Sequence, residues 1–199
     1  MTTTSSATAT GTTTRTTTRT TNRTGATVWL TGLPSAGKST VAHGLADRLA
    51  ADAVPVQVLD GDQVRPHLSG GLGFSREDRD TNVRRIGWVA GLLARHGVTV
   101  LVPVIAPYAA TRETVRRQHE RDGLPYLEVH VATSLDAARR RDVKGLYALA
   151  AAGELHGLTG VDDPYEPPVV PDVVLDTESS GVEETVTHLY SALVERGLL

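Results

Sequence analysis

From residue 27 onwards, two kinds of hydrophobic pattern alternate along the chain. Short apolar runs rich in β-branched residues predict five strands, at residues 27–32, 54–60, 98–106, 127–133 and 173–177. Longer segments between them place apolar residues on one helical face, as Val41, Leu45 and Leu49 show. They predict helices over 38–51, 77–96, 111–121 and 181–196, and another from Leu135. This alternation predicts an α/β fold with a five-stranded parallel sheet between layers of helices.

The first 26 residues lack any such pattern. Threonine dominates them, and their only charges are three arginines. A segment without apolar residues to bury cannot offset its ordering entropy, so we expect a disordered tail over 1–26 and a folded domain over 27–199. The tail is either dispensable or a targeting or docking segment.

Composition narrows the classes of partner. The 199 residues carry a net charge of -3, which gives no reason to expect nucleic acid as a partner. The absence of cysteine excludes disulfides and thiolate metal sites, and it fits a cytoplasmic protein. We expect no membrane contact, because no run approaches the roughly 20 apolar residues of a span.

The segment GLPSAGKST, residues 32–40, matches the phosphate-loop pattern G-x4-GK[ST] between a predicted strand and a predicted helix. In this pattern backbone N–H groups face the phosphates, Lys38 reaches the β- and γ-phosphate oxygens, and Ser39 can ligate Mg²⁺. The expected ATP-binding residues are Gly32, Leu33, Pro34, Ser35, Ala36, Gly37, Lys38, Ser39 and Thr40.

Other nucleotide-binding classes fit less well. A GTPase needs an Asn-Lys-x-Asp motif, whereas the only asparagines, Asn22 and Asn82, are not followed by lysine. A small-molecule kinase is therefore the leading class. Asp60-Gly61-Asp62 lies at the end of the second predicted strand, where one carboxylate can lie near Mg²⁺ and the other can face an acceptor hydroxyl. Asp-Gly-Asp is also a common turn sequence.

Five segments, in order, resemble the adenylylsulfate kinase (APS kinase) family of P-loop kinases. They are GLPSAGKST, DGDQVR (60–65), GLGFSREDRDTNVRR (71–85), VIAPY (104–108) and RDVKGLYALAAAGELHGLTGVDDPYEPP (141–168). The resemblance covers roughly residues 25–197. It implies a three-layer α/β/α fold with a lid over about 141–163, ATP and Mg²⁺ as cofactors, and a homodimer. It also implies that ATP phosphorylates the 3′-hydroxyl of adenosine 5′-phosphosulfate (APS), which yields PAPS for sulfate assimilation.

The resemblance also implies residue roles. Asp62 orients or deprotonates the acceptor hydroxyl, while Asp60 lies nearer the metal with Ser39. Arg141 lies near the ATP adenine, and Lys144 approaches the acceptor phosphates from the lid. The acceptor-binding residues are Asp62, Arg65, Phe74, Arg79, Asn82, Ile105 (through its backbone), Lys144 and Leu158. Phe74 would stack on the acceptor adenine, and Arg65, Arg79 and Asn82 would hold its phosphosulfate and ribose. Simpler interpretations are a surface charge for Arg79, a core cap for Phe74 and a solvated helix residue for Lys144.

The chain departs from the family pattern around the acceptor. Ala106 replaces a serine to which a phosphoserine intermediate has been ascribed, so transfer is expected to be direct and in line. Leu158 replaces a phenylalanine, and with it a stacking partner worth about 1–3 kcal/mol per base. The remaining departures are Ala109 for arginine, Val143 for proline and Gln63 for asparagine.

Three functional hypotheses follow. The first is an APS kinase. The second is a related kinase that acts on a hydroxyl of another nucleotide or nucleoside in a specialised biosynthetic pathway. The third is a catalytically weak nucleotide-binding regulatory protein.

Overall fold

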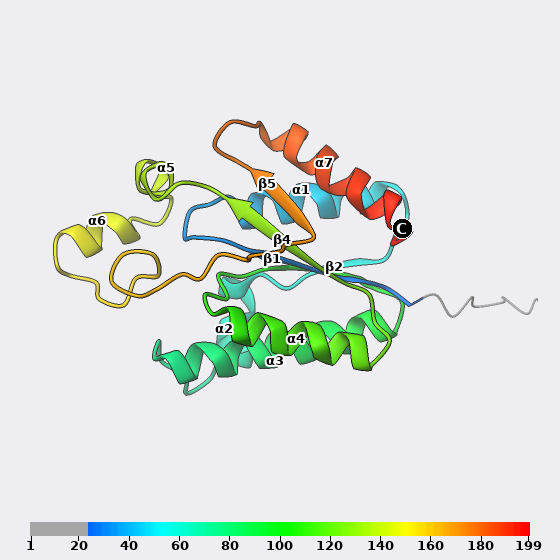
Figure 1. Ribbon diagram of the computed structural model, residues 1–199, viewed down its shortest axis with the longest axis horizontal. Coiled ribbons are helices and arrows are strands. Elements are labelled where there is room, and N and C mark those ends of the chain that lie inside the picture. The colour runs from blue at the N-terminus through cyan, green and yellow to red at the C-terminus, as the bar shows by residue number, and fades with distance from the viewer. Residues whose placement is uncertain (1–23) are drawn as a thin grey trace, which may run out of the picture.

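The computed structural model describes residues 24–199 and contains a five-stranded parallel sheet (Figure 1). The strands are β1 (Thr27–Thr31), β2 (Val56–Val58), β3 (Thr99–Pro103), β4 (Tyr126–Ala132) and β5 (Val173–Asp176), in the order β2-β3-β1-β4-β5. Because β1 lies between β3 and β4, strands distant in sequence are direct neighbours. The predicted fold class is confirmed.

Helices cover both faces of the sheet. They are α1 (Lys38–Ala51), α2 (Gly61–Leu68), α3 (Arg76–Arg95), α4 (Ala109–Arg121), α5 (Leu135–Arg141), α6 (Leu146–Ala151) and α7 (Val182–Glu195). In Figure 1, α1 and α7 lie on one face, and α2, α3 and α4 lie on the other. Ser75 and Ser134 cap the N-termini of α3 and α5, because each serine oxygen accepts a backbone N–H of the first turn.

Two of these helices were not predicted. Helix α2 contains Pro66 and buries no residue, so its sequence has no apolar periodicity that predicts a helix. Helix α6 is six residues long, starts after Gly145 and lies within the predicted lid. Strand β3 is also shorter than the predicted 98–106, because the chain leaves the sheet after Pro103 and Ala106 has a positive φ of 43°.

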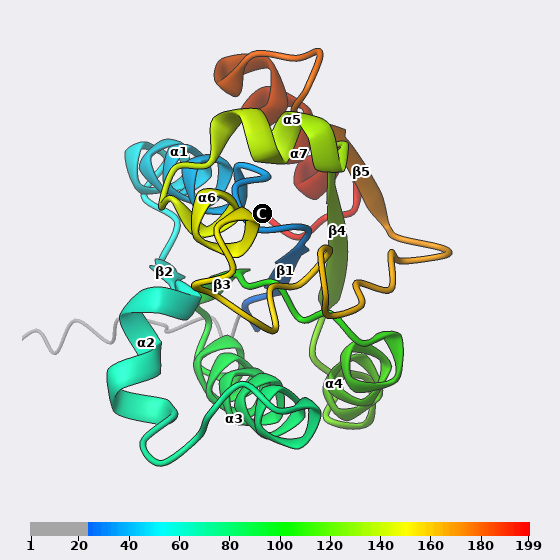
Figure 2. The same cartoon turned by 90° about the vertical axis from the view of Figure 1, so that its left-hand side faces the viewer.

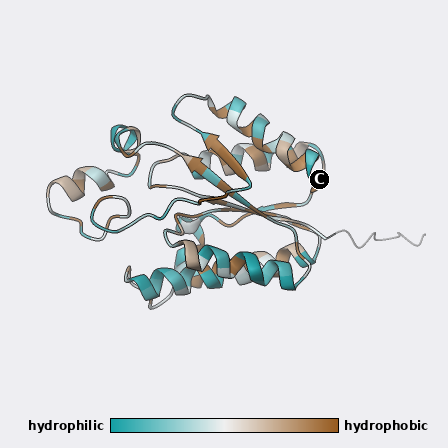
Figure 3. Ribbon diagram, in the orientation of Figure 1, coloured by the Kyte–Doolittle hydropathy of each residue, from teal (hydrophilic) through white to brown (hydrophobic). Residues whose placement is uncertain are grey.

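The sheet separates two apolar layers. On one face, Leu45 and Leu49 of α1 meet Leu189 and Leu193 of α7, and all four are fully buried. On the other face, Ile86 and neighbouring residues of α3 cover the central strands. Figure 3 shows the same division, since the strands are largely hydrophobic and the outer helix surfaces hydrophilic. Every residue of β1 and β3 is buried.

The folded domain begins before the predicted boundary at Thr27. Gly25 N donates to Ala94 O at 2.8 Å, and Val100 N donates to Ala26 O at 2.7 Å. These bonds attach residues 25 and 26 to the domain, whereas the rest of the predicted tail lies in residues 1–23, outside the described part of the chain. Within residues 24–199, no helix is both long and apolar enough to cross a membrane.

Candidate active site

Most of the predicted site residues line one cleft of about 900 Å³, whereas Gly32, Leu33 and Ala36 of the phosphate loop do not. It lies where the strands reach their carboxyl ends, the usual position for ligands in open parallel sheets. Figure 2 views the molecule from this side, with α5 and α6 in front of the sheet. The cleft is lined by the phosphate loop, the start of α2, the β3–α4 connection and the predicted lid.

The phosphate loop connects β1 to α1, as predicted. Ser35 and Gly37 both have positive φ, 60° and 96°, and these turns direct the chain into α1. Lys38 is 8% exposed, and its Nζ donates to Gly32 O at 3.0 Å and to Leu33 O at 2.7 Å. The loop's own carbonyl oxygens therefore hold the ammonium group inside the loop.

Burial lowers the pKa of Lys38 to about 8, and the charge of nearby Lys144 adds to this effect. The carboxylates of Asp60 and Asp62 act in the opposite direction. Phosphate oxygens near this lysine would favour its charged form and so raise its pKa again.

Ser39 and Asp60, the two predicted metal ligands, lie side by side. Ser39 Oγ donates to Asp60 Oδ2 at 2.5 Å, and Asp60 is 6% exposed. A hydroxyl and a carboxylate are the oxygen ligands that Mg²⁺ prefers. Residues 24–199 contain no group of three or more His, Cys, Asp or Glu suited to a metal. The pair therefore fits an ion that takes its other ligands from water and substrate phosphates.

Asp60 also positions Asp62. Its Oδ1 accepts the backbone N–H of Asp62 at 3.0 Å and caps α2, which places Asp62 in the first turn of that helix. The Asp62 side chain is 70% exposed, as a group that meets a substrate must be. Asp-Gly-Asp is thus a helix start beside the phosphate loop rather than a plain turn.

Lys144 forms an ion pair with Asp62 Oδ2. Lys144 lies in the turn between α5 and α6, so the interpretation as a solvated helix residue is wrong. The contact brings the predicted lid directly to the predicted catalytic carboxylate.

Phe74 and Arg65, both predicted to bind the acceptor, lie together in the cleft. The Phe74 ring is 65% exposed, so it does not cap a core, and the Arg65 guanidinium lies 4.2 Å from the ring centroid. Arg65 Nη2 also donates to Gly73 O at 2.7 Å. Asn82 Oδ1 accepts a hydrogen bond from Ser69 Oγ, and Ile105 O accepts one from Thr31 Oγ1 at 2.5 Å.

Arg79 joins α3 to the lid and is not a surface charge. Its side chain is 11% exposed. Nη1 donates to Thr159 Oγ1 at 2.9 Å, and Nη2 donates to Gly157 O at 2.6 Å and to Asp163 Oδ2 at 2.9 Å. An acceptor anion that uses Arg79 would have to compete with Asp163. No role was predicted for Asp163, although it lies in the segment TGVDDPYE, residues 159–166.

Leu158 belongs to a small apolar cluster in the lid. It is 6% exposed and clusters with Ala138 and Tyr147, while Leu33 of the phosphate loop packs against them. The Tyr147 hydroxyl donates to Pro34 O at 3.0 Å, a contact that the sequence did not reveal. Leu158 also lines the cleft, but most of its surface is covered by protein.

The opposite end of the cleft carries Arg141. Its guanidinium donates to Thr177 O, and Thr177 Oγ1 donates to Ala36 O of the phosphate loop at 2.8 Å. The loop after β5 lines this end as well, through Glu178, Gly181 and Val182. Arg141 is therefore on the phosphate-loop side of the cleft, where its predicted contact with the ATP adenine requires it.

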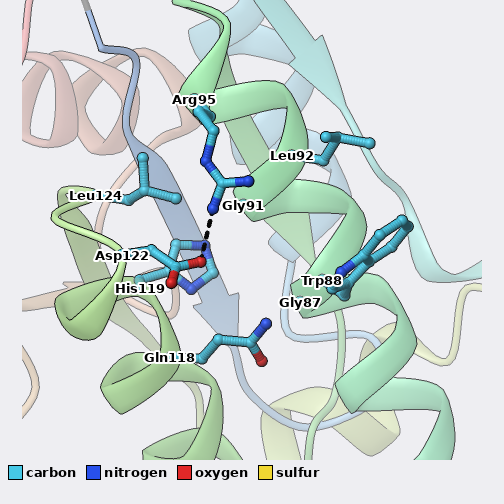
Figure 4. Close-up of a pocket in the computed structure, with 9 residues that line it drawn as sticks. All are labelled: Gly87, Trp88, Gly91, Leu92, Arg95, Gln118, His119, Asp122 and Leu124. Atoms are coloured by element: carbon cyan, nitrogen blue, oxygen red, sulfur yellow. Dashed lines mark hydrogen bonds and ion pairs between the residues drawn. The ribbon is translucent and has the colours of Figure 1, made fainter.

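A second hollow, between α3 and α4, contains none of the predicted site residues (Figure 4). Its volume is about 40 Å³, too small for a nucleotide. Trp88 is 59% exposed at its rim, and Arg95 pairs with Asp122 across it at 2.8 Å. The chemistry of the described residues is concentrated in the large cleft.

A parallel sheet, a phosphate loop with Lys38 and Ser39, and a carboxylate at the next strand end define a P-loop kinase. Residues 24–176 match the family described as Adenylylsulphate kinase. The chain belongs to this family.

Similar proteins agree with this assignment. The adenylyl-sulfate kinase of Chloroflexus aurantiacus is 56% identical over 85% of this chain and 89% of its own length. That of Myxococcus xanthus is 53% identical over 88% of this chain and 94% of its own. The structure of the Mycobacterium tuberculosis APS kinase in complex with AMPPNP and APS superposes with a TM-score of 0.84 at 43% identity. It covers 86% of this chain and 98% of the other.

Proposed function

We propose that the protein is an ATP-dependent kinase that phosphorylates the 3′-hydroxyl of APS to give PAPS and ADP. The observation that carries this proposal is that one cleft holds both a phosphate loop and, across Asp62, an exposed aromatic ring flanked by arginines. Family membership and the M. tuberculosis complex with APS support the choice of acceptor.

The donor residues would bind and orient ATP. The backbone of residues 32–40 would hold the phosphates at the N-terminus of α1, and Lys38 would exchange its two carbonyl partners for phosphate oxygens. Ser39 and Asp60 would hold Mg²⁺, which neutralises phosphate charge when bound. Arg141 would contact the adenine.

The acceptor residues would place the 3′-oxygen in line with the γ-phosphorus. Phe74 would stack on the adenine, and Arg65, Arg79 and Asn82 would bind the phosphosulfate and ribose. The 3′-oxygen forms a bond to the γ-phosphorus while the bond to the β–γ bridging oxygen breaks and ADP leaves. The hydroxyl proton passes to Asp62. Ala106 has no hydroxyl, so no phosphoserine arises there and the transfer is direct.

Lid closure would exclude water during this transfer. Lys144 would leave Asp62 for the acceptor phosphates, which frees the carboxylate to accept the proton. We also propose a homodimer in the cytoplasm. Light scattering would test the oligomeric state.

The test is a coupled assay of ADP release with ATP, Mg²⁺ and micromolar APS. Wild-type protein is expected to form PAPS, and Asp62→Ala to lower kcat by about 10²–10⁴-fold, the usual contribution of a general base. Asp62→Asn is the matched control, because it keeps the size of the side chain and loses only its proton-accepting charge. Both variants should bind ATP as the wild type does.

The same assay separates the alternatives. Leu158 offers the acceptor base little exposed surface, which leaves room for a base other than that of APS. A panel of other nucleotides and nucleosides as acceptors would reveal such a substrate. ATP binding without turnover of any acceptor would favour a regulatory protein and overturn the proposal.

A further inference from the structure

Arg112 is a buried guanidinium that the proposed chemistry does not use. It lies in the first turn of α4 and is 3% exposed. Its three nitrogens contact three different segments. Nε donates to Glu128 Oε1 at 2.7 Å, Nη1 to Ala106 O at 2.8 Å and Nη2 to Glu166 O at 2.7 Å. The planar guanidinium provides five N–H donors at fixed angles, and each of its three nitrogens donates to a protein acceptor here.

The segment that contains Ala106 is a wall of the cleft. Residues 103–107 line the cleft, and Ala106 within them has a φ of 43°, in the left-handed region. That region is sterically unfavourable for an L-residue, so surrounding contacts must maintain it. Arg112 holds Ala106 O, and Thr31 Oγ1 donates to the preceding carbonyl, Ile105 O, at 2.5 Å. Arg112 and Thr31 thus fix two successive carbonyl groups of the wall.

The second segment is a strap, residues 163–168, that follows the lid. Glu166 N donates to Pro107 O at 2.8 Å, and Glu166 Oε2 accepts from Ala109 N at 2.7 Å. The strap starts at Asp163, which pairs with Arg79 at 2.9 Å. Arg112 therefore joins the wall to the segment that holds an acceptor-side arginine.

The third contact anchors this arrangement to the sheet. Glu128 lies in β4, is 9% exposed and accepts from Arg112 Nε. Because β4 pairs with β1 and β5, the carboxylate cannot move without the sheet. Arg116, one turn further along α4, contacts the same Glu128 at 3.6 Å and Asp172 at 2.6 Å.

We propose that Arg112 is a positioning residue that fixes the acceptor-side wall and the strap, and thereby sets the affinity for the nucleotide acceptor without touching either substrate. The inference rests on the proposed function, since it assigns the wall to APS. Lysine cannot replace arginine here, because a single ammonium group cannot satisfy three acceptors in this fixed planar arrangement. Within residues 24–199, the hydrogen bonds of Arg112 go to the wall, the strap and β4, and none goes to the phosphate loop, so ATP binding should not depend on it.

The experiment compares KM values for APS and ATP in Arg112→Lys, Arg112→Gln and wild-type protein. We expect the KM for APS to rise about tenfold in both variants, because small misplacements of binding groups have effects of this order or larger. The KM for ATP and kcat at saturating APS should stay within about twofold of wild type. Arg116→Met is the matched control: it weakens the same ion-pair network and lowers the Tm, but it should leave the KM for APS unchanged.

A further variant tests the strap without removing the partner of the buried Glu128 carboxylate. Glu166→Ala removes only the bond from Ala109 N to the strap, so it should fold and raise the KM for APS by a smaller factor. Unchanged KM values for APS in the Arg112 and Glu166 variants would overturn the inference. Equal increases for ATP and APS, or an equal increase in Arg116→Met, would also overturn it, because they indicate a merely structural role. If wild-type protein itself fails to use APS, the proposed function falls, and this inference with it.

Discussion

The two ends of the cleft are built in different ways. At the donor end, nine consecutive residues supply the loop, and Asp60 at the next strand end completes the site through one short contact with Ser39. At the acceptor end, four separate segments contribute: α2, the start of α3, the β3–α4 connection and the lid. The donor site is thus largely a local backbone structure, whereas the acceptor site depends on side-chain contacts between distant segments. A substitution at one end should therefore change the kinetics for one substrate and leave those for the other unchanged.

The largest effect is expected at the donor end. Lys38→Met should lower kcat/KM for ATP roughly 10³-fold, because it removes the cation that meets the transferred phosphoryl group.

The same substitution should not destabilise the protein at pH 7. Burial lowers the pKa of Lys38 to about 8 from its ordinary value of 10.5, so the unfolded chain binds more protons than the folded chain between these two pH values. Below about pH 8 the charged, buried lysine therefore opposes folding. Steady-state kinetics and thermal melts would measure both effects. A large drop in Tm would contradict the second.

At the acceptor end, Phe74→Ala should raise the KM for APS roughly 10- to 100-fold, the loss expected for one stacking platform worth about 1–3 kcal/mol. The KM for ATP and the Tm should not change, because the ring is 65% exposed. Phe74→Leu keeps an apolar surface, so its KM for APS should lie between those of the wild type and Phe74→Ala. If ATP kinetics suffer equally, the two ends are not independent.

The pH dependence of ATP binding should follow Lys38. With a pKa of about 8 in the free protein, the lysine loses its proton above that pH, and bound phosphates must restore it. The Kd for ATP should therefore rise by up to about tenfold per pH unit above pH 8 and stay nearly flat below it. Titration calorimetry at pH 7, 8 and 9 measures this slope. Lys38→Met should lack it, and an identical slope in that variant would assign the proton elsewhere.

The smallest effect is expected in the lid. The Asp162 carboxylate accepts backbone N–H groups from Gly157 and Leu158, each at 2.6 Å, and the bond from Gly157 is the main reason that its pKa is lowered. Asp162→Asn weakens these two bonds on an exposed loop, so the KM for APS should rise only about twofold. Hydrogen exchange of the two amides should accelerate while the phosphate-loop amides stay protected. Unchanged exchange at Gly157 and Leu158 would show that other contacts order the lid.

The sequence revealed these two ends unequally. The phosphate loop and its flanking strand and helix were predictable because the motif is contiguous and its backbone conformation is local. Helix α2 was missed because it buries nothing and contains Pro66. The contacts of Tyr147 with Pro34, and of Arg79 with Asp163, join residues 113 and 84 positions apart, and periodicity carries no such information.

The sequence by itself determined the fold class, the donor site and the family, because hydrophobic periodicity and contiguous motifs act over a few residues. Only the tertiary structure decided that Leu158 packs inside the lid, that Lys144 pairs with Asp62, and that Arg112 holds the cleft wall to the strap. These contacts depend on how the chain brings remote segments to one edge of the sheet. Their physical basis is the requirement that buried charges and carbonyl groups find partners wherever the fold places them.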